Sequence, residues 1–158
     1  MKLAEAIILR DHNKGKVNEI YKLVHKTNVG QEKIPKRQLE KYNKEYLELK
    51  LQIMDLDSDI SYTEHVKLFN KNISLHEAAQ IKDAQIKKLY DLYEVEKEAR
   101  FININYKNLL ENDFIDNKIK ILGLVDIWVE IARLSEIIRK LTMDIEKIKW
   151  DIDLLSKK

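Results

Sequence analysis

The chain has 158 residues, of which 44% are hydrophobic and 35% are charged, and it contains no cysteine. The missing cysteine excludes disulfide bonds, thiolate catalysis and cysteine-ligated metal sites, and a formal net charge of +2 gives no global field that favours nucleic acid or an anionic membrane. The chain contains only three glycines and one proline, so it has few residues that interrupt helices. The composition therefore predicts a single, mainly α-helical domain over residues 1–158.

The first two predicted helices lie on either side of a turn that Gly30 and Pro35 bracket. The first helix spans about residues 2–26 and the second about residues 35–61, because proline suits the first helical position. In the second helix, apolar residues recur in steps of three and four, which places them on one seam facing a partner helix. The seam consists of Leu39, Tyr42, Tyr46, Leu49, Ile53, Leu56 and Ile60.

The last two predicted helices flank a stretch of different character. Residues 74–77 form a capping box that begins a third helix, which runs to about residue 100. Residues 101–125 contain two segments that alternate with period two, which favours a small β-hairpin and leaves an irregular segment as the alternative. A fourth helix then spans about residues 126–156. Its seam continues without a miss over Ile127, Ile131, Leu134, Ile138, Leu141, Ile145, Ile148, Ile152 and Leu155. Four such helices predict an elongated antiparallel bundle with coiled-coil-like seams.

Both seamed helices carry a second apolar face. In the fourth helix, this face consists of Val129, Ala132, Met143, Trp150 and Leu154, and in the second helix, of Leu47, Leu51 and Met54. A helix that is apolar on two sides must be covered on two sides, either by another helix of the bundle or by a second subunit of a symmetric homo-oligomer. Arg139 and Glu146 fall on the same line as Met143 and Trp150, and such a mixed strip suits an interface or a small-ligand site.

Motifs with a specific chemistry are missing from the sequence. Asp55-x-Asp57-x-Asp59 resembles the start of a calcium loop, but Ile60 and Val66 stand where glycine and glutamate are needed. The four histidines lack metal-ligand spacing, and there is no phosphate-cradling glycine loop or nucleophile elbow. The basic residues around 33–44 lie among glutamates, so this segment is only a weak indication of nucleic-acid binding. We therefore expect a protein without enzymatic activity, cofactor or metal.

A cytoplasmic location is expected from two further features of the sequence. The lack of cysteine fits a reducing compartment. No apolar run is long enough for a signal peptide or a membrane span.

Two cations interrupt the apolar line of the first helix. Arg10 and Lys14 occupy positions where apolar residues are expected. In a structural interpretation, each side chain reaches solvent or pairs with an acid such as Glu77 or Asp83. In a functional interpretation, the two side chains supply cations for a phosphate or carboxylate that docks between helices or subunits.

Three blocks of the chain, in order, carry a resemblance to a known family. They are Lys2-Leu3-Ala4-Glu5-Ala6-Ile7 with Arg10; Ile60-Ser61-Tyr62-Thr63 with Ser74-Leu75-His76-Glu77-Ala78 and Lys82-Asp83; and Ile119-Lys120 with Val125-Asp126, Arg139-Lys140-Leu141, Ile145 and Lys149-Trp150. Together they resemble the septicolysin-like family of small bacterial and phage proteins. The resemblance implies a helical bundle without enzyme activity. The chain departs from the family pattern at His76, Lys82, Glu146 and Lys149.

These observations lead to three functional hypotheses. The first is a non-catalytic binding protein that works as a homo-oligomer and holds a small anionic ligand. Its ligand-binding candidates are Arg10, Lys14, Glu77, Asp83, Lys120, Arg139 and Trp150. Cations beside an aromatic ring suit a nucleotide, so the most specific form is a phage anti-defence protein that sequesters a nucleotide signal of host immunity. The second hypothesis is a structural or protein-interaction module. The third is a cytolysin-like, membrane-active protein with exposed amphipathic helices, although a thiol-activated mechanism needs the cysteine that is missing here.

Overall fold

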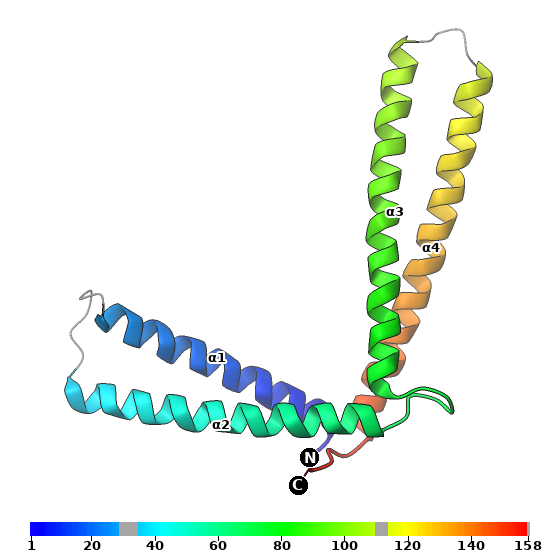
Figure 1. The fold of residues 1–158 in the computed structure, drawn as a ribbon. Helices are drawn as coiled ribbons and strands as arrows, with labels where there is room; N and C mark the ends of the chain where they lie inside the picture. The colour runs from blue at the N-terminus through cyan, green and yellow to red at the C-terminus, as the bar shows by residue number, and fades with distance from the viewer. Residues whose placement is uncertain (29–34, 110–113, 158) are drawn as a thin grey trace. The chain divides into compact units, whose positions relative to one another are not determined.

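A computed structural model describes the backbone of residues 1–28, 35–109 and 114–157, and the side chains of these residues apart from 101–109 and 114–122. Within these ranges four helices follow one another, α1 (Leu3–Asn28), α2 (Lys36–Val66), α3 (Leu75–Leu109) and α4 (Phe114–Asp151) (Figure 1). Apart from two isolated β-bridges, the described backbone has no strand, which confirms the mainly α-helical bundle. The chain divides into two compact units: unit 1 is Met1–His76 with Glu146–Lys158, and unit 2 is Glu77–Ile145.

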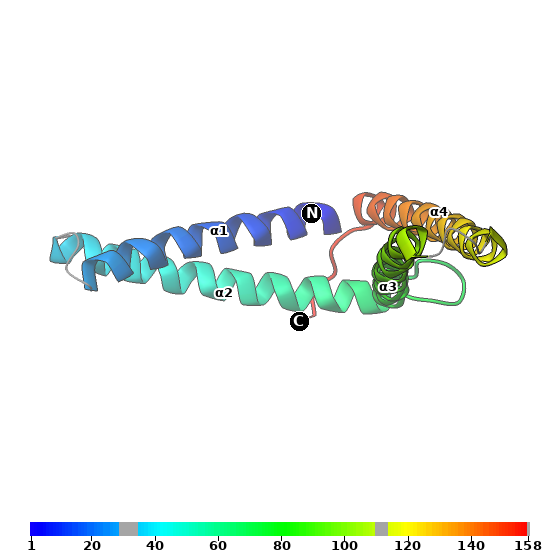
Figure 2. The ribbon, with the colours of Figure 1, turned by 90° about the horizontal axis from the view of Figure 1, so that it is seen from above.

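In unit 1, α1 and α2 pack against each other through their apolar seams, and Figures 1 and 2 show the two helices side by side and antiparallel. Val17 and Ile20 of α1 form one buried cluster with Leu49 and Ile53 of α2. Each such side chain contributes about 1.5–3 kcal/mol when it leaves water. The seam predicted for the second helix is therefore confirmed.

A second buried cluster closes the other end of this pair. Its buried members are Leu3, Ala6, Ile60 and Leu75, and the partly buried residues around it are Ile7, Leu56, Phe69, Ile148, Ile152 and Leu154. The cluster thus joins the first residues of the chain to residues near its end. In both views the two marked chain ends lie beside the C-terminal half of α2.

Backbone hydrogen bonds fix the two ends of the chain to each other. The Leu3 amide donates to the Ile152 carbonyl (3.1 Å), and the Leu154 amide donates to the Met1 carbonyl (2.9 Å). The Lys2 ammonium reaches the Asp153 carboxylate (2.8 Å) and lowers the pKa of that carboxyl through their hydrogen bond. We call this arrangement of residues 1–3 and 152–155 the terminal clasp.

Thr63 connects the terminal clasp to α2. Its side chain is fully buried, and its hydroxyl donates to the Asp59 carbonyl (2.7 Å) while accepting the Leu155 amide proton (2.9 Å). Two residues after Leu155, the Lys157 amide donates to the Asp59 carboxylate (2.9 Å). One buried hydroxyl therefore satisfies an amide that has just left helical structure.

In unit 2, α3 and α4 lie side by side in both ribbon views. All nine seam positions predicted for the fourth helix are buried or half-buried, from Ile127 to Leu155, and Leu134 and Ile145 are almost fully buried. The coiled-coil seam predicted from the sequence is therefore confirmed across both units.

The β-hairpin predicted over residues 101–125 is wrong. Residues 101–109 continue α3 and residues 114–125 begin α4, while residues 110–113 lie outside the described part of the chain. Alternation over four to six residues does not distinguish a strand from one side of a helix, and extending an existing helix costs little compared with nucleating it. The fourth helix accordingly begins at Phe114, and it ends at Asp151, where the chain turns into the terminal clasp.

We predict that replacing Thr63 by valine, which has nearly the same shape, lowers the free energy of unfolding by about 1–3 kcal/mol, because the Leu155 amide then stays buried without an acceptor. Urea denaturation followed by circular dichroism measures this loss. Thr142→Val is the matched control, since Thr142 also bonds a helix carbonyl (Ile138, 2.7 Å) but is exposed, and its effect should stay within about 0.5 kcal/mol. Equal losses in both variants would contradict a special role for Thr63.

Candidate functional site

The outer face of α2, opposite its buried seam, carries an unusual amount of exposed apolar surface. The exposed fractions of Leu47, Leu51 and Met54 are 62%, 62% and 66%. Steps of four and three place these three side chains on one line along the helix. We call this line the outer stripe. The described residues leave its three side chains exposed.

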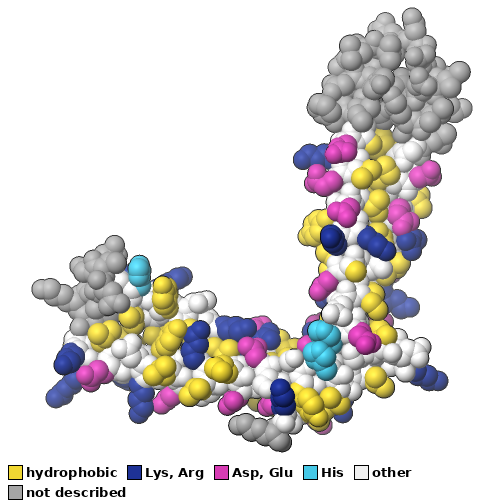
Figure 3. Space-filling view, viewed as in Figure 1, with side chains coloured by type: hydrophobic (Ala, Val, Ile, Leu, Met, Phe, Trp, Pro, Cys, Tyr) yellow, Lys and Arg dark blue, Asp and Glu magenta, His cyan; other side chains and the backbone are white. Residues whose placement is uncertain are grey.

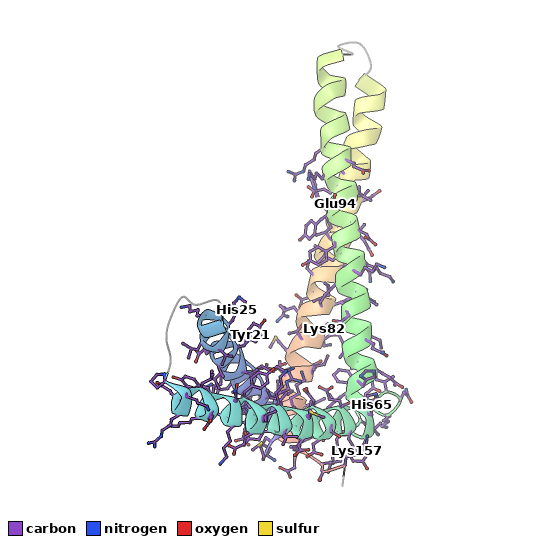
Figure 4. All side chains as sticks on the ribbon, turned by 60° about the vertical axis from the view of Figure 1, so that its left-hand side comes forward. Tyr21, His25, His65, Lys82, Glu94 and Lys157 are labelled. Carbon is purple, nitrogen blue, oxygen red and sulfur yellow. The ribbon has the colours of Figure 1, made fainter. Side chains whose placement is uncertain are left out.

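Beyond Met54, the same side of α2 becomes polar and hollow. One hollow of about 240 Å³ is lined by Asp55, Ser58, Asp59, Ser156 and Lys157. An adjoining hollow of about 250 Å³ is lined by Ser58, Ser61, Tyr62, His65 and Lys157. The two share Ser58 and Lys157, so they form one groove between α2 and the segment after the terminal clasp, which we call the α2–tail groove. Figure 4 labels His65 and Lys157, which belong to its two sides.

His65 is held in place at the end of this groove. Its Nδ1 lies 2.7 Å from the Ser61 carbonyl, and its ring stacks on His76 with the ring centroids 4.0 Å apart. The hydrogen bond to a carbonyl requires the proton on Nδ1, which leaves Nε2 as an acceptor in the neutral ring. The groove therefore offers hydroxyl, imidazole, carboxylate and ammonium groups together.

Arg10 and Lys14, the two cations of α1, pair with an acid on α2. The Arg10 guanidinium lies 3.3 Å from the Asp57 carboxylate, and the Lys14 ammonium lies 3.9 Å from the same oxygen. Arg10 also pairs with Asp11 at 2.9 Å. The structural interpretation named Glu77 or Asp83 as partners, whereas these described contacts go to Asp57, because α1 packs on α2.

The other predicted ligand-binding residues are distributed over both units. Glu77 and Asp83 are exposed on α3 in unit 2, and Trp150 is half exposed in unit 1. The Lys120 side chain lies outside the described residues. Of the seven candidates, the described contacts bring only Arg10 and Lys14 together, around one carboxylate.

Arg139 lies on the exposed face of α4 in unit 2. Its Nε donates to Glu136 (2.9 Å) and its guanidinium contacts the Met143 sulfur (3.1 Å). The hydrogen bond lowers the pKa of the Glu136 carboxyl and raises the pKa of Arg139. Arg133, also exposed on α4, forms the same kind of ion pair with the half-buried Glu130 three residues before it.

An exposed aromatic and ionic cluster lies between α3 and α4. The Trp128 indole donates to Glu96 (3.1 Å), which also pairs with Arg100, and the Arg100 guanidinium lies 5.6 Å from the Trp128 ring centroid. Cation–π attraction of this kind is worth about 0.5–1 kcal/mol at an exposed site. In Figure 3, hydrophobic side chains reach the surface between charged ones over both units.

The sequence interpretation missed the α2–tail groove. The only sequence signal is that Ser58 and Tyr62 continue the spacing of the outer stripe. The other side of the groove comes from the segment after α4, which the terminal clasp positions through backbone groups.

Two features are absent from the described residues. Among the described side chains, no three His, Cys, Asp or Glu residues form a group that could hold a metal ion. Within the same part of the chain, no helix combines the length and the apolar character needed to cross a membrane.

Comparisons with known proteins inform the fold. No protein-family model and no curated protein matches the chain. Among solved structures, the chain is similar to a functionally unknown conserved protein from Corynebacterium diphtheriae, with a TM-score of 0.77 and 22% identity over 98% of this chain and 99% of that chain. At this identity the similarity shows a shared fold and carries no statement about function.

We predict that Asp57→Asn lowers the free energy of unfolding by up to about 1 kcal/mol, because Arg10 and Lys14 lose the carboxylate that they share. The loss should shrink at high salt, since these groups are partly exposed. Glu130→Gln, which removes the partner of Arg133, is the control with the same loss of charge, and its effect should be smaller. Salt-dependent urea denaturation of both variants tests this, and a salt-independent loss at Asp57 would contradict it.

Proposed function

We propose that this chain is a non-catalytic helical binding protein that works as a homo-oligomer. The observation that carries this proposal is the exposed apolar surface on the outer sides of α2 and α4. On α4, Val129, Met143 and Trp150 are 63%, 58% and 50% exposed, in addition to the outer stripe on α2. Leu154, which the sequence assigned to the same face, packs in the core of unit 1 instead.

The sequence left two possible covers for these apolar residues, another helix of the bundle or a second subunit, and their exposure helps to choose between the two. Leu51 and Met143 are 62% and 58% exposed in the described part of the chain, so a second subunit is the cover that we favour. Exposed apolar surface arranged in lines along two helices is typical of interaction surfaces, whereas isolated exposed apolar side chains are ordinary. Self-association of identical chains through such surfaces usually closes with two-fold symmetry.

The proposed ligand is a small anion of the nucleotide class, taken up where subunits meet. Within the protomer, carboxylates already neutralise Arg10, Lys14 and Arg139. A nucleotide phosphate would have to displace one of these acids or find further cations on a neighbouring subunit. A protein that sequesters a nucleotide signal of host immunity stays the most specific form of this prediction.

We predict that the purified chain has more than one protomer's mass in solution. Light scattering over a concentration series measures the mass, and native mass spectrometry of the same sample detects any small molecule that is released. A mass equal to one protomer at every concentration and at low salt would contradict the proposed homo-oligomer. An oligomer without a released molecule favours the protein-interaction form of the proposal over ligand binding.

We predict that a saturating cyclic or ADP-ribose-type nucleotide stabilises the protein against heat, by about 2.7 kcal/mol when the ligand is at 100 times its Kd. Arg139→Gln should reduce this stabilisation, because Arg139 lies on the mixed apolar and charged face of α4. Arg133→Gln removes an equivalent exposed arginine with the same glutamate spacing and should keep it. Absence of stabilisation by every nucleotide would contradict the ligand and leave the homo-oligomer standing.

A further inference from the structure

We infer that two copies of this chain pair through the outer faces of their α2 helices, running antiparallel, with a two-fold axis at the level of Glu48. This inference rests on the proposed self-association, and it names the surface, the partner and the register. Three features of α2 carry it: the outer stripe, the distribution of charge along the helix and the α2–tail groove.

The outer stripe provides the apolar centre of the contact. In an antiparallel pair centred near Glu48, Leu47 of one copy lies against Leu51 of the other, and the same contact occurs twice. Met54 then lies against the aliphatic part of Lys44 from the second copy. The side chains that are more than 60% exposed in one copy therefore cover each other in two.

The charge of α2 changes sign along its length. Between residues 36 and 51, five lysine or arginine residues outnumber three glutamates, whereas residues 52–66 contain four acids and no lysine or arginine. These four acids are Asp55, Asp57, Asp59 and Glu64, of which Asp57 already pairs with Arg10 and Lys14 of the same chain. A parallel pair would place like charges together, which disfavours that arrangement. An antiparallel pair places the basic half of each helix against the acidic half of the other.

The spacing of these charges gives the register. Arg37, Lys41, Glu48, Asp55 and Asp59 follow one another in steps of four, seven, seven and four residues, along one side of the outer stripe. This spacing reads the same in both directions. In a pair centred on Glu48, Lys41 thus meets Asp55 of the second copy and Arg37 meets Asp59, each twice. Within this set of five residues, the like-charge contact is the one at the axis between the two Glu48 side chains, and Lys44 lies one turn away from it.

The α2–tail groove receives the basic side chains. Asp55 and Asp59 line its hollow of about 240 Å³, which provides room for a long side chain that arrives from outside. Asp59 already accepts the Lys157 amide proton with one oxygen (2.9 Å). Neither Lys41 nor Asp55 has a hydrogen bond or an ion pair within the described chain, so both are available to a second copy.

The size of the contact predicts how the pair behaves. The strip from Arg37 to Asp59 is about 33 Å long at 1.5 Å per residue. One helix per subunit gives a small interface, so the pairing should depend on concentration. Because its charged contacts are at the rim, it should also weaken as salt is raised.

Exchanging the charges of one contact tests the register. Lys41→Glu and Asp55→Lys each create two like-charge contacts in their own pair, and each should raise the dimer Kd about tenfold. An equal mixture of the two variants forms only opposite-charge contacts between unlike chains, so it should recover the wild-type Kd as a heterodimer. Sedimentation equilibrium measures the Kd, and native mass spectrometry distinguishes the heterodimer from the two homodimers.

Lys87→Glu, an exposed site on α3, is the control for the change in net charge and should leave the Kd unchanged. Circular dichroism confirms that all variants are folded. A wild-type dimer whose Kd is unaffected by both exchanges, or a mixture no tighter than either variant alone, overturns the α2 pairing while the proposed homo-oligomer survives. A wild-type protein that is monomeric throughout overturns both.

Discussion

A helix that packs against one neighbour can bury only one of its sides, and this constraint shapes the surface of the protein. In unit 1, α1 covers the seam of α2 around Leu49 and Ile53. The residues on the far side of α2, with Leu51 at their centre, then face solvent. The same holds for Val129 and Met143 on α4. Exposed apolar residues on the described helices are therefore a direct consequence of packing long amphipathic helices in pairs.

Charge decides how such surfaces are used. Within the chain, acids are placed beside cations at short range: Asp57 serves both Arg10 and Lys14, and Glu136 serves Arg139. These pairs lower the attraction of each guanidinium for an outside phosphate. On α2, Lys41 and Asp55 lie fourteen residues apart, so they do not neutralise each other. Separated charges of this kind favour a partner with the reverse order, which is what an antiparallel copy provides.

Much of the fold could be predicted from the sequence, because a seam repeats the same apolar signal every three or four residues. The buried line of α4 from Ile127 to Leu155 is an example. Residues 101–125 were misassigned, since a short alternating run fits a strand or a helix equally well. The partner of Arg10 depends on which helix packs beside α1, and one sequence does not contain that information. The α2–tail groove depends on the backbone hydrogen bond between Leu3 and Ile152, which leaves no mark on residue type, and on the bond from the Leu155 amide to the Thr63 hydroxyl, whose partner 92 residues away the sequence does not indicate.

The terminal clasp also constrains how the chain acquires its structure during synthesis. The cluster around Leu3 and Ile60 contains Ile148 and Ile152, which the ribosome adds more than 140 residues after Leu3. Until those residues emerge, the beginning of α1 has an apolar side with no cover, and the buried hydroxyl of Thr63 has no Leu155 amide to accept. Contacts that span nearly the whole sequence form slowly. The beginning of α1 is thus among the last parts of unit 1 to be completed, although its pairing with α2 needs only residues that are closer in the sequence.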